Sequence, residues 1–331
     1  MPNPEKEPRS PNDPILDRVG PIRLLKLLKR GGMGDIFVGQ HEILRRRVAV
    51  KMPIPERPDQ DFLCHSLLRE ARALASVKHR NVVTIYDVGV LEDGTPYAVL
   101  ELLDGLSLDR IIDSQGALPP SEVLRISAEV LAGMAAFHRQ HYVMVDIKPD
   151  NVMVVGGPLV YRSKKEYPWI KLIDLGAVRM TRDPRVPLTV RLDNAVGSSW
   201  YMSPEAVLGL TLDARTDLYA FGILVYEMCT GRVPFASSDN SLTFEMHLYD
   251  SPPRLSSVCA WVARDSGLDQ LVHTCLAKSP EDRPANVAEA FRLLRTAAAD
   301  GASAAPFSEK LSPQELHAAP TLVLNQRLAV I

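Results

Sequence analysis

Cysteine is scarce in this sequence, and the spacing of the few that occur argues against two kinds of site. The four cysteines are Cys64, Cys229, Cys259 and Cys275, and no two of them form a C-x-x-C pair. Each lies in an apolar, helix-like context, which favours buried free thiols in a reducing compartment over disulfides or a metal site. We therefore expect four buried free thiols.

Long apolar runs and a surplus of one charge are missing as well. No uninterrupted apolar run approaches the roughly 18 residues of a membrane span, and no cationic segment followed by an apolar core opens the chain. The 38 basic and 40 acidic residues nearly cancel, so net charge indicates neither nucleic acid nor an anionic membrane as a partner. These absences predict a cytoplasmic protein. Its 331 residues, 46% of them hydrophobic, are ample for one large or two moderate cores.

The most informative stretch is VMVDIKPDNVM, residues 143–153. Its apolar ends are expected to be buried, and Pro149 interrupts any continuous helix between them. Three polar side chains, Asp146, Lys148 and Asn151, are therefore expected on a rigid turn. A lysine beside a carboxylate and an amide suits a negatively charged reacting group.

A second stretch, IKLIDLG at residues 170–176, predicts a short apolar strand that ends in Asp174 and a glycine. Together the two stretches supply two carboxylates and an amide close to strand ends. Mg²⁺ prefers such oxygen ligands and shares them with phosphate. The residues therefore indicate a site for magnesium and a phosphate group.

At these residues the sequence resembles protein kinases. DIKPDN at residues 146–151 is similar to their catalytic loop, and DLG at 174–176 is similar to their D-F-G metal motif. Further family motifs follow in the expected order over roughly residues 20–295, which makes the combination very specific. The variety that the sequence resembles is the bacterial, eukaryotic-like Ser/Thr kinase.

The resemblance implies an α+β fold with two lobes, the protein-kinase fold. A small antiparallel β-sheet lobe with one main helix would cover residues 20–101, and a larger, mainly α-helical lobe would cover residues 102–296. Residues 1–19 are expected to form a disordered leader, because prolines recur among charges there. Residues 297–331 are expected to form a flexible tail.

The small lobe is expected to begin with a strand at residues 22–28 and a turn and strand in KRGGMGDIFV, residues 29–38. The family's G-x-G-x-x-G loop has glycines where this sequence has Lys29, Gly31 and Gly34. Glycines let the backbone approach phosphates, although a Gly-rich β-turn without a ligand shows the same pattern. Lys29 could donate to a phosphate but would stiffen the turn.

Lys51 ends the apolar strand RVAVK, which is similar to the family's V-A-I-K motif. The resemblance implies that Lys51 contacts the α- and β-phosphates, whereas the alternative is a lysine that reaches solvent. Residues 61–77 predict a helix with Glu70 on its inward face. An inward carboxylate needs a partner, and Lys51 is the candidate. The alternative for Glu70 is a surface pair with a neighbouring arginine.

Further strands are predicted at residues 82–88 and 97–100, and the residues that follow resemble the hinge between kinase lobes. The resemblance implies that backbone groups of Glu101 and Leu103 bind adenine, with Leu100 at the gatekeeper position. The residues implied to hold the nucleotide are Leu28, Gly31, Gly32, Gly34, Ile36, Ala49, Lys51, Glu101, Leu103 and Met153.

In the large lobe, Ser121 is the predicted N-cap of a helix that reaches about residue 141. Residues 174–205 resemble the activation segment and close with SPE in place of A-P-E. Asp217 opens an apolar helix that should be buried all round, and it is implied to accept N–H bonds from the catalytic loop. The resemblance also implies an ion pair between Arg283 and Glu205.

The implied reaction is transfer of the γ-phosphoryl group of ATP to Ser/Thr hydroxyls of protein substrates in signal transduction, including the chain itself through self-association. The implied cofactors are ATP and Mg²⁺, with Mn²⁺ as an alternative, and nucleic acid is not an expected partner. The implied catalytic residues are Asp146, Lys148, Lys51 and Glu70, and the implied metal ligands are Asn151 and Asp174. Asp146 would orient the substrate hydroxyl, and Lys148 would stabilise the transferring phosphoryl group.

Two departures from the family concern residues 144 and 145, because the family's H-R-D reads MVD here. Met144 can replace the packing of the histidine but not its hydrogen bond. Val145 cannot receive a phosphate from the activation segment as the arginine does. We therefore expect activity that does not depend on phosphorylation of Thr181 or Thr189.

These departures, together with Lys29 in the glycine-rich loop, leave one main alternative and one weaker one. The main alternative is a pseudokinase, a nucleotide-binding or scaffolding module without turnover. Against it stands the complete set of five residues Lys51, Glu70, Asp146, Asn151 and Asp174. A kinase-like enzyme acting on small molecules is disfavoured, because SPE and the matching arginine belong to the architecture for protein substrates.

Overall fold

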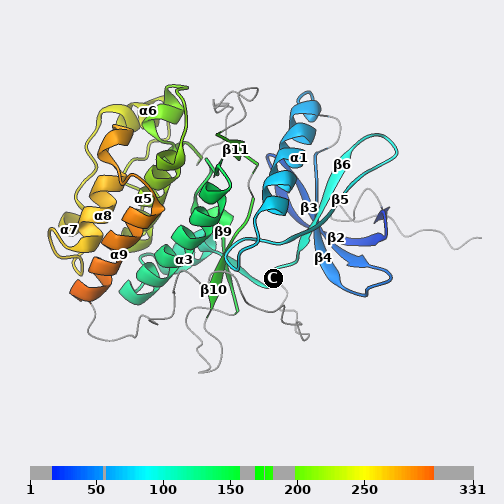
Figure 1. Ribbon diagram of the computed structural model, residues 1–331, viewed down its shortest axis with the longest axis horizontal. Coiled ribbons are helices and arrows are strands. Elements are labelled where there is room, and N and C mark those ends of the chain that lie inside the picture. The colour runs from blue at the N-terminus through cyan, green and yellow to red at the C-terminus, as the bar shows by residue number, and fades with distance from the viewer. Residues whose placement is uncertain (1–16, 55–56, 157–167, 175, 182–197, 302–331) are drawn as a thin grey trace, which may run out of the picture.

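The computed structural model describes residues 17–54, 57–156, 168–174, 176–181 and 198–301 (Figure 1). Most of the expected leader and tail, residues 1–16 and 302–331, therefore lie outside the described residues. So do Leu175, Thr189 and Gly197 of the expected activation segment.

The small lobe is a six-stranded antiparallel sheet in the order β1-β2-β3-β4-β6-β5. The strands are β1 (Arg18–Val19), β2 (Ile22–Gly31), β3 (Gly34–His41), β4 (Arg47–Met52), β5 (Ile85–Val90) and β6 (Pro96–Glu101). Helix α1 (Gln60–Ser76) lies against β5 and β6 (Figure 1). This confirms the expected antiparallel lobe with one main helix.

Both faces of strand β4 are buried, which explains why its sequence does not alternate clearly. Val48 and Val50 join a core on one face of the sheet with Ile22 and Tyr97. Because successive strand residues point to opposite faces, Ala49 and Lys51 turn the other way, and Ala49 belongs to the core that continues into the large lobe. The strand therefore presents its lysine to the space between the lobes.

The large lobe is mainly helical. Its helices are α2 (Leu108–Gln115), α3 (Pro120–Arg139), α4 (Pro204–Val207), α5 (Ala214–Thr230), α6 (Asn240–Tyr249), α7 (Leu255–Val258), α8 (Gly267–Cys275) and α9 (Val287–Gly301). Helix α5 is buried almost all round, as its apolar sequence predicts, and α3, α8 and α9 pack around it. The two-lobed α+β architecture is confirmed.

Short strands of the large lobe frame the catalytic stretch. The order β10-β9-β7 forms one antiparallel sheet, and β8 pairs with β11. Their bounds are β7 (Gly105–Ser107), β8 (Tyr142–Val143), β9 (Val152–Val155), β10 (Trp169–Leu172) and β11 (Arg179–Met180). Residues 146–151 thus run between two strand ends, with one 3₁₀ turn, η1 (Pro149–Asn151), at the proline.

Several local predictions are wrong in ways that have physical causes. Helix α3 begins at Pro120 with Pro119 as its N-cap, so Ser121 is not the cap; proline suits the first helical turn because the N–H it lacks would be unpaired there. Strand β5 begins at Ile85 rather than at Val82, which instead forms an isolated parallel bridge to Leu172. Cys64 is only partly buried, although all four thiols are free.

Strand β1 and helix α9 each include residues outside the expected limits of 20 and 296. Val19 of β1 is fully buried, so the sheet begins before residue 20. Helix α9 continues to Gly301, and Ala297 and Ala298 within it are buried. Among the described residues, no helix is both long and apolar enough for a membrane span.

Candidate active site

Lys51 forms ion pairs with a residue of each lobe. Its Nζ lies 2.8 Å from Oε2 of Glu70 on α1 and 2.7 Å from Oδ1 of Asp174, which follows β10. Lys51 is 4% exposed and Glu70 3%, so Glu70 is an inward residue with a buried partner and not a surface glutamate. Three residues predicted for the site are therefore in direct contact.

The charges in this cluster stabilise one another. Burial opposes the charged form of Lys51, but the carboxylates of Asp174 and Glu70 outweigh it and raise the pKa of the lysine. Burial would also raise the pKa of Asp174, yet Lys51, the N–H of Gly176 and Lys148 together lower it. Lys51 is thus held as a cation and Asp174 as an anion at neutral pH.

The catalytic loop brings Asp146, Lys148 and Asn151 together. Lys148 Nζ lies 2.9 Å from Asp146 Oδ2. The amide Nδ2 of Asn151 donates to the same Oδ2 and to the carbonyl of Asp146, at 2.9 Å each. The 3₁₀ turn at Pro149 brings Asn151 back toward Asp146, so its amide can reach a carboxylate five positions earlier in the chain.

Asp217, in the first turn of α5, holds the backbone at the start of this loop. Its carboxylate accepts the backbone N–H groups of Met144 at 2.9 Å and Val145 at 2.7 Å. The carboxylate is fully buried and also lies 2.7 Å from Nε2 of His138. Val145 has φ of +68°, which is strained for a β-branched residue, and the two bonds from Asp217 hold the backbone in that conformation. The expected role of Asp217 is confirmed.

Asn151 and Asp174 lie on neighbouring backbone. The N–H of Ile173 donates to the carbonyl of Asn151 at 2.9 Å, so the residue before Asp174 is bonded to the loop. An amide oxygen and one carboxylate fit Mg²⁺, which prefers oxygen ligands and leaves other positions to water and phosphate. No group of three or more His, Cys, Asp or Glu side chains forms a metal site among the described residues, so any metal here would depend on such shared ligands.

The glycine-rich turn joins β2 to β3 as a tight hairpin, with Gly31 opposite Gly34. A Cβ on Gly34 would collide with the backbone carbonyl of Met52, so only glycine fits there. Lys29 is exposed on β2 and pairs with Ile36, outside the turn itself. A Cβ on Gly176 would collide with Sδ of Met33 at the turn, so the turn reaches the segment after Asp174.

The other residues predicted to hold the nucleotide lie on strands around Lys51. Ile36 is opposite Lys51, and Ala49 is opposite Leu100, across adjacent strands. Ile36 and Leu103 are partly buried against the core that contains Ala49 and Leu100. The remaining positions are Leu28, half-exposed on β2, Gly32 in the turn, Glu101 at the end of β6 and Met153 on β9.

Sequence reasoning missed a bond that ties α1 to the metal end of the site. The hydroxyl of Ser66, 2% exposed, donates to the carbonyl of Gly176 at 2.6 Å. The two residues are 110 positions apart, and a lone serine on a helix gives no signal of such a contact. The bond holds the helix that carries Glu70 against the segment that carries Asp174.

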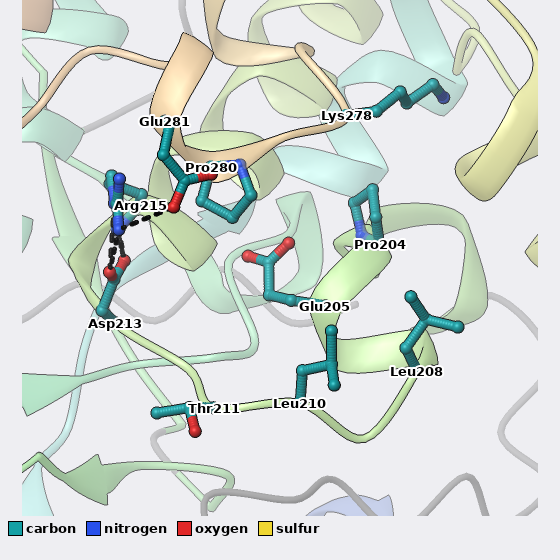
Figure 2. A pocket seen from close by; sticks show the side chains of 10 residues that line it. All are labelled: Pro204, Glu205, Leu208, Leu210, Thr211, Asp213, Arg215, Lys278, Pro280 and Glu281. Atoms are coloured by element: carbon teal, nitrogen blue, oxygen red, sulfur yellow. Dashed lines mark hydrogen bonds and ion pairs between the residues drawn. The ribbon is translucent and has the colours of Figure 1, made fainter.

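A second ion pair stabilises the large lobe away from this cluster. Arg283 binds Glu205 with two bonds of 2.7 and 2.8 Å, as expected. Burial would raise the pKa of Glu205, but Arg283 lowers it. Figure 2 shows a pocket that Glu205 lines, where Arg215 lies between Asp213 and Glu281. None of the residues predicted for catalysis, nucleotide or metal lines this pocket, so it is separate from the candidate active site.

Comparison with known proteins places these features in one family. The family model described as protein kinase domain matches residues 22–294. Similar proteins include the serine/threonine-protein kinase Pkn1 of Myxococcus xanthus, 34% identical over 87% of this chain and 40% of the relative. PksC of Streptomyces coelicolor is 34% identical over 84% of this chain and 49% of its own length. PknL of Mycobacterium tuberculosis is 34% identical over 77% of this chain and 60% of its own length. The chain thus spans less than two thirds of the length of each of these relatives.

Proposed function

The chain belongs to the protein kinase family, and from this premise we propose that it transfers the γ-phosphoryl group of ATP to Ser/Thr hydroxyls of proteins. The observation that carries the proposal is the contact of the buried Lys51 with both Glu70 and Asp174 beside the catalytic loop. Relatives named serine/threonine-protein kinases support the choice of hydroxyl substrates. Lys148, two residues after Asp146, supports the same choice.

In this mechanism Asp146 accepts a hydrogen bond from the substrate hydroxyl and orients it toward the phosphate. Lys148, 2.9 Å from that carboxylate, stabilises negative charge on the transferring group. Phosphoryl transfer needs positioning and charge neutralisation more than covalent chemistry, and both side chains are fixed by their mutual contact. The amide of Asn151 donates to the same carboxylate oxygen and also holds it in place.

Lys51 would bind the α- and β-phosphates, with Glu70 holding the ammonium in place. Asn151 and Asp174 would hold Mg²⁺, with Mn²⁺ as an alternative, and the metal supplies neutralisation of the triphosphate when bound. The backbone of Glu101 and Leu103 would bind adenine. Ala49, Ile36, Leu28, Met153 and the glycine turn would enclose the nucleotide.

A pseudokinase is the alternative that the departures at Met144 and Val145 favour. Asp217 supports activity instead, because it fixes the backbone of both residues through their N–H groups and needs neither side chain. The hydrogen bond that a histidine at position 144 would make is therefore dispensable for holding the loop. We also propose that the chain phosphorylates itself, and that the free thiols reflect a cytoplasmic location.

The deciding experiment compares the wild type with Asp146→Asn in labelled ATP and Mg²⁺ on a generic acceptor protein. The variant should lose a factor on the order of 10²–10⁴ in rate while its affinity for ATP changes little. Equal incorporation by both proteins, or none by either with ATP still bound, would favour the pseudokinase. Small-molecule acceptors in parallel test the alternative of a kinase-like enzyme that acts on small molecules. Intact mass before and after incubation tests self-phosphorylation.

A further inference from the structure

Glu101, the last residue of β6, is bonded on both its backbone and its side chain to the segment that follows α1. Its N–H donates to the carbonyl of Thr84 at 2.8 Å. Its carboxylate Oε2 accepts the N–H of Thr84 at 3.2 Å. The strand end that is expected to meet adenine is therefore fixed to its neighbour by a closed pair of bonds.

The same Oε2 atom also accepts a hydrogen bond from the ammonium of Lys171 on β10, at 2.8 Å. Lys171 is 8% exposed, and its Nζ also donates to the carbonyl of Val82 at 3.2 Å. A buried ammonium is costly without partners, and this one takes its partners from the hinge end of β6 and from the residues after α1. Lys171 thus bridges the two lobes.

Strand β10 itself is bonded to those residues by its backbone. The N–H of Leu172 donates to the carbonyl of Asn81 at 2.8 Å, and the N–H of Val83 donates to the carbonyl of Leu172 at 3.0 Å. Lys171 therefore extends from a strand whose backbone is itself hydrogen-bonded to the residues after α1. Asp174, the expected metal ligand, follows Lys171 by three residues on the same segment.

We propose that Lys171 is a positioning residue for the nucleotide: through the carboxylate of Glu101 it fixes the adenine end of the cleft relative to the strand that carries Asp174. The inference rests on the proposed function, because it assigns the cleft to ATP. Lys171 touches neither the reacting atoms nor the phosphates. It acts by setting the distance between two groups that must hold the same ligand at once.

The contacts in the rest of the site indicate that the Lys171–Glu101 pair positions the nucleotide and does not hold the lobes in an inactive arrangement. The Lys171–Glu101 pair is formed in the same structure in which Lys51 contacts both Glu70 and Asp174. The bridge is therefore compatible with the assembled arrangement. Removing it should weaken the binding of ATP in the ground state and the transition state alike, which raises KM and leaves kcat nearly unchanged.

The test measures KM for ATP, kcat and the dissociation constant of ADP for Lys171→Met, Lys171→Arg and Glu101→Gln. Lys171→Met should raise KM and the dissociation constant roughly tenfold, with kcat within about threefold of the wild type. Lys171→Arg keeps the charge and should recover most of the affinity. The combination of Lys171→Met with Glu101→Gln should cost little more than either change alone, because both break one contact.

A matched control is Lys278→Met, which removes a part-buried lysine that donates to the carbonyls of Met246 and His247 and should leave KM for ATP unchanged. An unchanged KM and ADP affinity in Lys171→Met, or a higher kcat/KM, would overturn the inference; the second result would mean that the bridge restrains the lobes. If the wild type neither binds ADP nor transfers phosphate, the proposed function fails instead.

Discussion

The carboxyl group of Glu227 is partly buried, and burial disfavours its ionised form. Burial raises its pKa from 4.5 to about 7, opposed by a bond from the hydroxyl of Tyr201 at 2.6 Å and assisted by Asp150, Asp113 and Asp109. Unfolding frees the group to ionise, so between pH 4.5 and 7 the unfolded chain binds fewer protons than the folded one. Stability must therefore fall as pH rises through this window.

Replacing Glu227 by Gln removes this penalty while keeping an acceptor for Tyr201. Above pH 7 the variant should be more stable than the wild type by about 3 kcal/mol, and the difference should vanish below pH 4.5. Urea unfolding at pH 4.5 and pH 8 measures it. Tyr201→Phe removes the donor that lowers the pKa, so it should move the window upward. A pH-independent difference between wild type and Glu227→Gln would contradict the assignment.

At the residue scale, the sequence predicted the charged residues of the expected motifs better than the residues that hold the segments around them in place. Lys51 ends an apolar strand, Glu70 lies on the inward face of a predicted helix, and Arg283 matches a family motif. Each has the partner expected. Ser66 and Lys171 gave no such signal. A serine on a helix and a lysine in a short strand are common on surfaces, and only distant chain segments make them buried.

At the scale of elements, β8 and β11 connect the catalytic loop to the segment after Asp174, and regulation by phosphorylation would act there. Val145 offers no charge to a phosphate. Thr181 is bonded to its surroundings, since its hydroxyl donates to the carbonyl of His141 at 3.1 Å. The double variant Thr181→Ala, Thr189→Ala should therefore keep kcat/KM within about threefold of the wild type. Rates on a protein acceptor, with the phosphorylation state read by mass, check this.

Two arginines near this segment would become candidate phosphate partners if the double variant lost activity. Arg179 on β11 is 8% exposed, and its Nε has no partner among the described residues; the same holds for Nε and Nη2 of Arg69 on α1. Burial and the charge of Arg69 lower the pKa of Arg179 to about 10. A loss of tenfold or more in the double variant would contradict the prediction, and Arg69→Met and Arg179→Met would then test whether these guanidinium groups receive a phosphate.

Element boundaries were harder to predict than elements, because tertiary contacts decide them. Val82 has the apolar, β-branched character of a strand residue, yet it bridges to Leu172 of the other lobe and lies outside β5. Helix α3 starts one residue before Ser121 because two prolines fix the backbone there. Local propensity gave the right element types and could not give these ends.

At the scale of the whole molecule, one core joins the lobes. Ala49 and Leu100 of the small sheet, Leu74 of α1 and Leu131 of α3 belong to a single buried cluster. The sequence predicted the two-lobed fold because the family's motifs recur in order, but periodicity alone could not show that the core is continuous across the hinge. A continuous core implies that both lobes unfold in one cooperative transition.

A ligand that occupies the cleft should therefore stabilise the whole domain, and this tests the metal site without turnover. A non-hydrolysable ATP analogue with Mg²⁺ at 100 times its Kd should add about 2.7 kcal/mol of stability, which corresponds to a rise in Tm of about 5–10 °C. Chelation of Mg²⁺ should remove most of this rise, because the triphosphate would then face the carboxylate of Asp174 without neutralisation.

Two variants separate the metal from the other charges in that experiment. Asp174→Asn should abolish most of the metal-dependent rise in Tm, whereas Asp146→Asn should keep it, since Asp146 is expected to bind the substrate hydroxyl and not the metal. Thermal unfolding followed by fluorescence, with and without chelator, gives both values. A rise in Tm that survives chelation in the wild type would mean that Asn151 and Asp174 do not hold a metal needed for nucleotide binding. Two separate transitions would show that the shared core does not couple the lobes.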